Sequence, residues 1–122
     1  MPVVYASTSI ALACLETLVH LSGDAPLPLQ RWLVAISVQH EHWQQRNILE
    51  PADLPGWDHR PPTSVSTGWG DRWLTNGTSL LAEVPSVIIP EERNVLINPR
   101  HPHASSLLAT ICRPWIDDER LP

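Results

Sequence analysis

The chain has 122 residues, of which 43% are hydrophobic and 17% charged, and its formal net charge is −5. This length suffices for one hydrophobic core but not for two, so we expect a single domain over residues 1–122. The negative charge and the scattered arginines exclude a general attraction to a phosphate backbone, and we expect no direct nucleic-acid binding.

The first apolar stretch contains Glu16, His20 and a Gly23–Asp24 turn, which leaves it too short and too interrupted to span a bilayer. It also lacks the basic start of a signal peptide. We therefore expect no membrane association and a cytoplasmic location. Cys14 and Cys112 lie in apolar runs, which predicts two buried free thiols rather than a disulfide.

The N-terminal third begins with a strand and a helix. Residues 3–5 predict a short strand, and the hydroxyls of residues 7–9 offer helix N-caps. Residues 10–21 are rich in Ala and Leu, with no Gly or Pro, which favours a helix that stops at Ser22–Gly23. Because apolar residues surround nearly its whole circumference, we expect this helix to be central to the core.

Strand patterns dominate the rest of the chain. The β-branched run over residues 32–38 is typical of a central strand covered on both faces. Further strands are predicted over residues 80–84, 87–89, 95–97 and 108–115. Residues 47–67 are expected to form an ordered loop with room for one helical turn. A short helix is predicted from Ser66 or Thr67 to Asn76–Gly77. With helices placed between strands, the predicted fold is mixed α/β or α+β.

Glu16 is the one carboxylate in the apolar N-terminal helix. One interpretation is a Glu16–His20 pair at a partly exposed helix edge, worth about 0.2–0.5 kcal/mol. The other is a functional carboxylate held in a cleft, because desolvated acids cluster at functional sites. The helical pattern alone leaves both open.

Three segments resemble a known family. The stretch PVVYASTSIALACLETLVHL resembles one motif of the RES domain, and EVPSVIIPEERNVLINPRHP resembles its second signature block. Between them, LPGWDHRPPTSVSTGWGDRWLTNGTSLLAEVPS is similar to the family's aromatic-rich run before a GxxWL helix. The resemblance covers nearly the whole chain. It implies an α+β fold like that of ADP-ribosyltransferases, with a mixed sheet and a central apolar helix.

The same resemblance implies a function. RES domains are the toxin half of bacterial toxin–antitoxin pairs, and their partner is an Xre-type helix-turn-helix antitoxin. Characterised members cleave the nicotinamide–ribose bond of NAD by hydrolysis or phosphorolysis, or transfer ADP-ribose to a protein. NAD is then a substrate, and no cofactor is implied. The protein acceptor and a homo-oligomeric state are left open by the sequence.

The resemblance also implies site residues, namely Tyr5, Glu16, Ser86 and Asn98. A carboxylate at Glu16 would stabilise the positive charge that develops on the ribose as the bond breaks. Tyr5 would offer an aromatic face to nicotinamide. Ser86 would orient Glu16 or the substrate rather than act as a nucleophile. Asn98 would either tie its own turn together through an Asx interaction or contact the substrate.

One part of the family pattern has no counterpart here. In the family, a segment upstream of PVVY supplies a strand and an arginine that is expected to bind the NAD phosphates, and Arg31 and Arg93 fall elsewhere in the pattern. We therefore expect an N-terminally truncated RES domain whose Met1 is an internal methionine. The alternative to an active toxin is an impaired remnant that only binds its antitoxin.

Histidines raise a third alternative, a metal hydrolase. They form two pairs, His40 with His42 in QHEHW and His101 with His103 in HPH. Neither pair has the spacing of an H-E-x-x-H motif or a zinc finger, so we expect no metal site.

Overall fold

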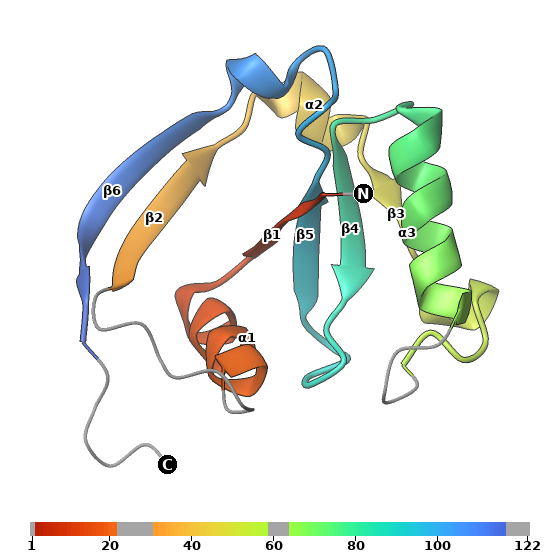
Figure 1. The fold of residues 1–122 in the computed structure, drawn as a ribbon, viewed down its shortest axis with the longest axis horizontal. Helices are drawn as coiled ribbons and strands as arrows, with labels where there is room; N and C mark the ends of the chain where they lie inside the picture. The colour runs from red at the N-terminus through yellow and green to blue at the C-terminus, as the bar shows by residue number, and fades with distance from the viewer. Residues whose placement is uncertain (1, 22–30, 59–63, 117–122) are drawn as a thin grey trace.

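Two β-sheets and three α-helices organise residues 2–21, 31–58 and 64–116, which are the residues described by the computed structural model (Figure 1). The helices are α1 (Ile10–Leu21), α2 (His40–Gln44) and α3 (Ser64–Asn76), and two short 3-10 turns are η1 (Pro51–Asp53) and η2 (Ala104–Ser106). The strands are β1 (Val4–Ser7), β2 (Arg31–Ser37), β3 (Asn47–Ile48), β4 (Leu81–Pro85), β5 (Arg93–Ile97) and β6 (Leu108–Trp115). The predicted α+β class is confirmed.

The larger sheet is mixed and has the strand order β1-β5-β4-β3. β5 is antiparallel to both of its neighbours, whereas β3 runs parallel to β4. In this register Ser7 of β1 and Val84 of β4 lie on either side of Asn94 of β5. Because side chains alternate between the faces of a strand, the register decides which polar side chains meet on one face.

The core lies on both faces of this sheet. Leu81, Val95 and Ile97 belong to one buried cluster, which the ends of the β2–β6 ribbon and α2 help to cover. Ala82 and Leu96 belong to a second cluster with Trp73 of α3. The indole N–H of Trp73 donates to Ser79 Oγ at 2.9 Å, so the buried ring leaves no polar atom unsatisfied.

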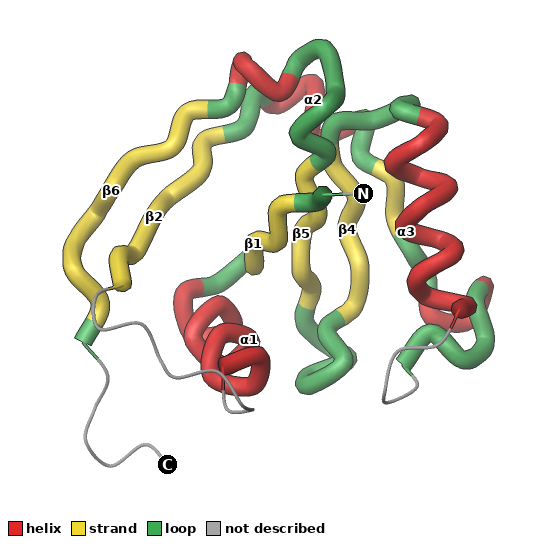
Figure 2. The backbone as a smooth tube through the Cα atoms, viewed as in Figure 1, coloured by secondary structure: helices red, strands yellow, loops and turns green. Residues whose placement is uncertain are grey.

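The smaller sheet is an antiparallel ribbon of β2 and β6, which extends away from the larger sheet (Figures 1 and 2). The prediction that residues 32–38 form a central strand covered on both faces is wrong. β2 is hydrogen-bonded to β6 alone among the described strands. Trp32 and Val34 of β2 are exposed, and most of β6 is exposed as well. A continuous apolar run therefore marks a strand but not its place in a sheet.

Helix α1 has the predicted bounds but not the predicted burial. Ser9 Oγ accepts the N–H of Leu12 at 3.1 Å, which is the predicted N-cap interaction. Leu12 is only 1% exposed, but Ile10 is 55% and Val19 is 53% exposed. The expectation of a helix central to the core is wrong, because these exposed side chains leave part of the circumference of α1 uncovered. The predicted stop at Ser22–Gly23 lies outside the described residues.

Helix α3 begins two residues before the predicted start and ends where predicted. Gly77 follows it with a φ of 60° and donates its N–H to Trp73 O at 3.2 Å, a left-handed cap that suits glycine. The short helix α2 was not predicted. The predicted loop over 47–67 contains one helical turn, η1, as expected, but it is interrupted by β3 and by the start of α3.

Two predicted strands differ from the structure. β1 begins at Val4 and continues to Ser7, two residues past the predicted end, because it pairs with β5 along its length. Residues 87–89 form a turn rather than a strand. The N–H of Ser86 donates to Glu92 O, and the N–H of Glu92 donates to Ile89 O, both at 2.9 Å. This apolar run therefore belongs to the turn that connects β4 to β5.

The cysteines are free, as predicted, but not both buried. Cys14 is half-buried and Cys112 is exposed on β6, so neither thiol has the expected burial. None of the helices in the described part of the chain combines the length and the apolar composition needed to cross a bilayer.

Candidate active site around Glu16

Glu16 projects from the half-buried side of α1 toward the end of the larger sheet. Its Oε1 atom accepts two hydrogen bonds, one from Ser86 Oγ at 2.8 Å and one from Asn94 Nδ2 at 2.6 Å. Hydrogen bonds to a carboxylate are among the stronger ones in proteins. The carboxylate is therefore held by the sheet, and the side chain of His20, its alternative partner, lies outside the described residues.

Ser86 is fixed at the start of the β4–β5 turn and is 0% exposed. Its hydroxyl donates to Glu16, and its oxygen accepts the N–H groups of Ile88 and Ile89, each at 3.1 Å. A serine hydroxyl has one donor and two acceptor positions, so this one is fully used. The Ser86 hydroxyl therefore serves both its own turn and the carboxylate of Glu16. With both lone pairs engaged, Ser86 is suited to positioning rather than to nucleophilic attack.

Asn94 is a member of this cluster that the sequence did not reveal. Its Nδ2 group donates to Glu16, and its Oδ1 atom accepts the Ser7 hydroxyl at 2.7 Å. Ser7 and Asn94 are directly opposite each other in the β1–β5 register. The sequence offers only a weak signal for either residue, namely a hydroxyl at the end of a strand and an amide at the start of another.

Tyr5 is brought to the same side of β1 as Ser7, because residues two apart along a strand share a face. Its side chain is 71% exposed. Since Ser7 contacts Asn94, which contacts Glu16, the aromatic ring stands on the face of the strand that carries the cluster. A tyrosine that is so exposed on an edge strand does not contribute to the hydrophobic core, and its ring is accessible to a ligand.

Asn98 lies apart from the cluster, just beyond the far end of β5. Its Oδ1 atom accepts the N–H of Arg100 at 3.0 Å, and its own N–H donates to Leu80 O at 2.9 Å. It follows Asn94 by four residues, roughly 13 Å along an extended strand. The side chain makes the predicted Asx interaction within its turn, and the structure does not bring it together with Glu16.

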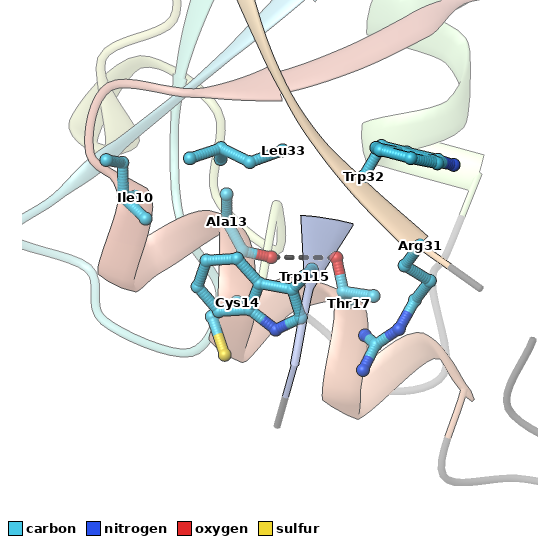
Figure 3. A pocket seen from close by; sticks show the side chains of 8 residues that line it. All are labelled: Ile10, Ala13, Cys14, Thr17, Arg31, Trp32, Leu33 and Trp115. Atoms are coloured by element: carbon cyan, nitrogen blue, oxygen red, sulfur yellow. Dashed lines mark hydrogen bonds between the residues drawn. The ribbon is translucent and has the colours of Figure 1, made fainter. Parts of the chain in front are cut away.

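A small cavity of about 90 Å³ lies along a different side of α1 (Figure 3). Ile10, Ala13, Cys14 and Thr17 face it from α1, with Arg31 from β2 and Trp115 from β6 opposite them. The Thr17 hydroxyl donates to Ala13 O at 2.8 Å and so turns back to its own helix. Ligand sites usually measure about 300–1,000 Å³, and this cavity does not include Glu16.

The arginines considered in the sequence stand outside the cluster. Arg93 donates from Nη1 to Leu49 O at 3.2 Å, and its Nη2 lies 3.6 Å from a carboxylate oxygen of Glu50. Arg31 lines the small cavity along α1. Arg93 is thus paired with Leu49 and Glu50 rather than with Glu16.

Three of the four histidines considered in the sequence meet at the opposite end of the sheet. The rings of His42 and His103 are 5.0 Å apart between centroids, and those of His101 and His103 are 5.6 Å apart. Partial burial lowers the pKa of His101, and the neighbouring His103 and His42 lower it further. Within the described ranges, no group of three or more histidine, cysteine or acidic side chains has a geometry that could hold a metal ion.

Comparison with known proteins shows to which family the chain belongs. A model of the RES domain matches residues 1–122. The chain belongs to the RES domain family. A RES relative named "Prs ADP-ribosylating toxin", from Sphingobium sp. (strain YBL2), is 47% identical over 120 residues, which is 98% of this chain and 74% of the relative.

Two further RES relatives are each named "Toxin Res". The one from Pseudomonas putida (strain KT2440) is 42% identical over 106 residues, covering 86% of this chain and 70% of the relative. The one from Yersinia enterocolitica (strain 8081) is 33% identical over 109 residues, covering 88% of this chain and 69% of the relative. The resemblance that the motifs suggested is confirmed at the level of the family.

Proposed function

We propose that this RES domain is a bacterial toxin that cleaves the nicotinamide–ribose bond of NAD, with Glu16 as the catalytic carboxylate. The observation that carries the proposal is the double hydrogen bond on Glu16 Oε1. Both donors use the same oxygen. A carboxylate held in this way has one oxygen fixed by the protein, and in this proposal the other oxygen, Oε2, faces the substrate.

The chemistry of NAD suits such a group. When the bond between the anomeric carbon and the nicotinamide nitrogen breaks, its electron pair goes to the nitrogen and neutralises the pyridinium ring. Positive charge develops on the ribose, as in the oxocarbenium-like transition state of glycoside cleavage. The carboxylate of Glu16 would stabilise that charge and accept a hydrogen bond from a ribose hydroxyl. A water, a phosphate or a protein side chain then forms the new bond to the anomeric carbon and loses a proton.

Two other residues have roles in this proposal. The exposed ring of Tyr5 offers nicotinamide an aromatic face, an interaction worth about 0.5–1.5 kcal/mol beyond the area that it buries. Ser86 keeps Glu16 in place through its hydroxyl. Asn98 is assigned to its turn rather than to the substrate, because its Oδ1 accepts from Arg100 within the turn and its Nδ2 donates to Leu74 O.

The proposed partner is an Xre-type helix-turn-helix antitoxin, and the proposed place of action is the cytoplasm. The toxin names of the RES relatives support a partner that restrains the activity. If the proposal is correct, induced expression of the chain arrests bacterial growth, an Xre-like protein is encoded beside it, and co-expression of that protein relieves the arrest. An arrest that this protein leaves unchanged would contradict the pairing.

The reaction itself is tested with the purified chain and NAD. We expect nicotinamide to be released, as measured by chromatography, in buffer without phosphate, with phosphate and with added bacterial protein. ADP-ribose as the product indicates hydrolysis, and phosphorylated ADP-ribose indicates phosphorolysis. With NAD labelled in its adenine, label bound to protein indicates transfer of ADP-ribose. Nicotinamide release no faster than in buffer alone, under all three conditions, would overturn the proposed function.

A further inference from the structure

We infer that Asn94 is a positioning residue for the NAD reaction, and that Ser7 sets its orientation. Together they would form a directed hydrogen-bond chain from the edge strand β1 to the carboxylate of Glu16. This inference rests on the proposed function and adds to it two residues to which the sequence assigned no role at the site.

The direction of the chain follows from the chemistry of its members. An ionised carboxylate can only accept hydrogen bonds, so the Asn94 group that faces Glu16 at 2.6 Å must be the amide nitrogen. The amide oxygen then faces Ser7, whose hydroxyl donates to it at 2.7 Å. Each donor therefore reinforces the next, and the orientation of the Asn94 amide is determined at both ends.

The two donors on Oε1 also determine how the carboxylate is turned. The last torsion of a glutamate side chain is broad and soft, so an unrestrained carboxylate samples many orientations. Here Ser86 approaches the same oxygen from the β4–β5 turn and Asn94 approaches it from β5. Two donors from different elements fix the plane of the group and thereby the position of Oε2. Productive geometry depends on such restraint, because small misplacements of a catalytic group cost rate.

A purely structural role for Asn94 is the competing explanation. Ser7 and Asn94 face each other across β1 and β5, so their hydrogen bond also ties the edge strand to the sheet. A loss of activity in Asn94→Ala alone would fit both explanations. The test therefore needs a readout that a loss of stability does not change, and the pH profile of turnover supplies it.

Asn94→Asp is the deciding variant. The introduced aspartate has the same shape and can still accept from Ser7, but at neutral pH it places a second negative charge against Glu16. Two close carboxylates cannot both ionise easily, so the apparent pKa of the pair rises. When the pair holds one proton, the introduced side chain can donate to Glu16 again. We expect turnover of Asn94→Asp to be about 10- to 100-fold below wild type at pH 8 and to approach wild type as the pH falls.

The controls separate the explanations. Asn94→Ala is expected to lose activity at every pH without recovery in acid, and Asn47→Asp, at an exposed asparagine of β3, is expected to keep the wild-type profile. An Asn94→Asp profile parallel to that of the wild type would overturn the inference while leaving the proposed function intact. Absence of nicotinamide release by the wild-type chain would instead overturn the proposed function.

Substitutions of Ser7 provide a second test, which can still be made if Asn94→Asp does not fold. Ser7→Ala removes the donor that orients the amide but leaves Asn94 in place. We expect kcat to fall about three- to tenfold with KM for NAD unchanged, and Ser7→Thr, which keeps the hydroxyl, to restore kcat. A Ser7→Ala variant with the wild-type kcat would contradict the directed chain.

Discussion

The two sides of helix α1 have similar, mostly apolar residues but differ in how they are packed. Toward the larger sheet, Leu12 is buried and Glu16 is hydrogen-bonded to two other elements. Toward the β2–β6 ribbon, apolar and small side chains border a cavity of about 90 Å³ (Figure 3). Both sides are almost entirely apolar in sequence. The comparison teaches that apolar composition predicts the helix, whereas the neighbouring sheet decides which side is packed and where the one carboxylate is held.

The largest expected stability effect tests this asymmetry directly. Leu12→Ala removes a side chain that is 1% exposed and leaves a cavity, so the free energy of unfolding should fall by about 2–5 kcal/mol. Leu15→Ala, at a position on the same helix that is 39% exposed, should lower it by less than about 1 kcal/mol. Urea denaturation of the two variants measures both changes. Equal losses of unfolding free energy in the two variants would show that the two positions of α1 are equally packed.

A smaller effect is expected at the opposite end of the sheet, where His101 lies. Its pKa in the folded chain is lowered from 6.5 by burial, by His103 and by His42, while Glu41 and Gln45 line the same cavity of about 260 Å³. The unfolded chain therefore binds the proton first as the pH falls. The stability that neutral His101 contributes is fully present above about pH 6.5 and is lost as the pH falls through its lowered folded pKa.

His101→Gln removes this titration. Between pH 7.5 and 5.5, the wild type should lose more stability than His101→Gln, as measured by urea denaturation at both values. His40→Gln, at an exposed histidine of α2, is the matched control and should follow the wild type. A His101→Gln variant that loses as much stability in acid as the wild type would show that the pH dependence arises elsewhere.

Local signals predicted much of the fold. The Ala- and Leu-rich run with a serine cap gave the bounds of α1, and Asn76–Gly77 gave the end of α3, because caps and propensities act over a few residues. The strand β6 was also predicted with its observed bounds. The place of β2 in a separate ribbon could not be predicted, because strand pairing is decided by contacts far apart in the sequence.

The same distinction holds for the site. Glu16 stands out as an acid in an apolar helix, and Ser86 was selected only through the resemblance to the RES family. Asn94 and Ser7 were not predicted, because their partners lie 78 and 87 residues away along the chain and meet them through strand register. A one-residue slip in that register would turn Asn94 to the other face of the sheet.

The most direct test of the central claim, that the carboxylate held by Ser86 and Asn94 cleaves NAD, is the rate of nicotinamide release by Glu16→Gln. Glutamine keeps the shape and can accept the same two hydrogen bonds through its amide oxygen, so the fold should persist while the negative charge is lost. We expect release to fall by about 100-fold or more. Glu91→Gln, at an exposed glutamate of the β4–β5 turn, should keep the wild-type rate. Equal rates for Glu16→Gln and the wild type would contradict the account.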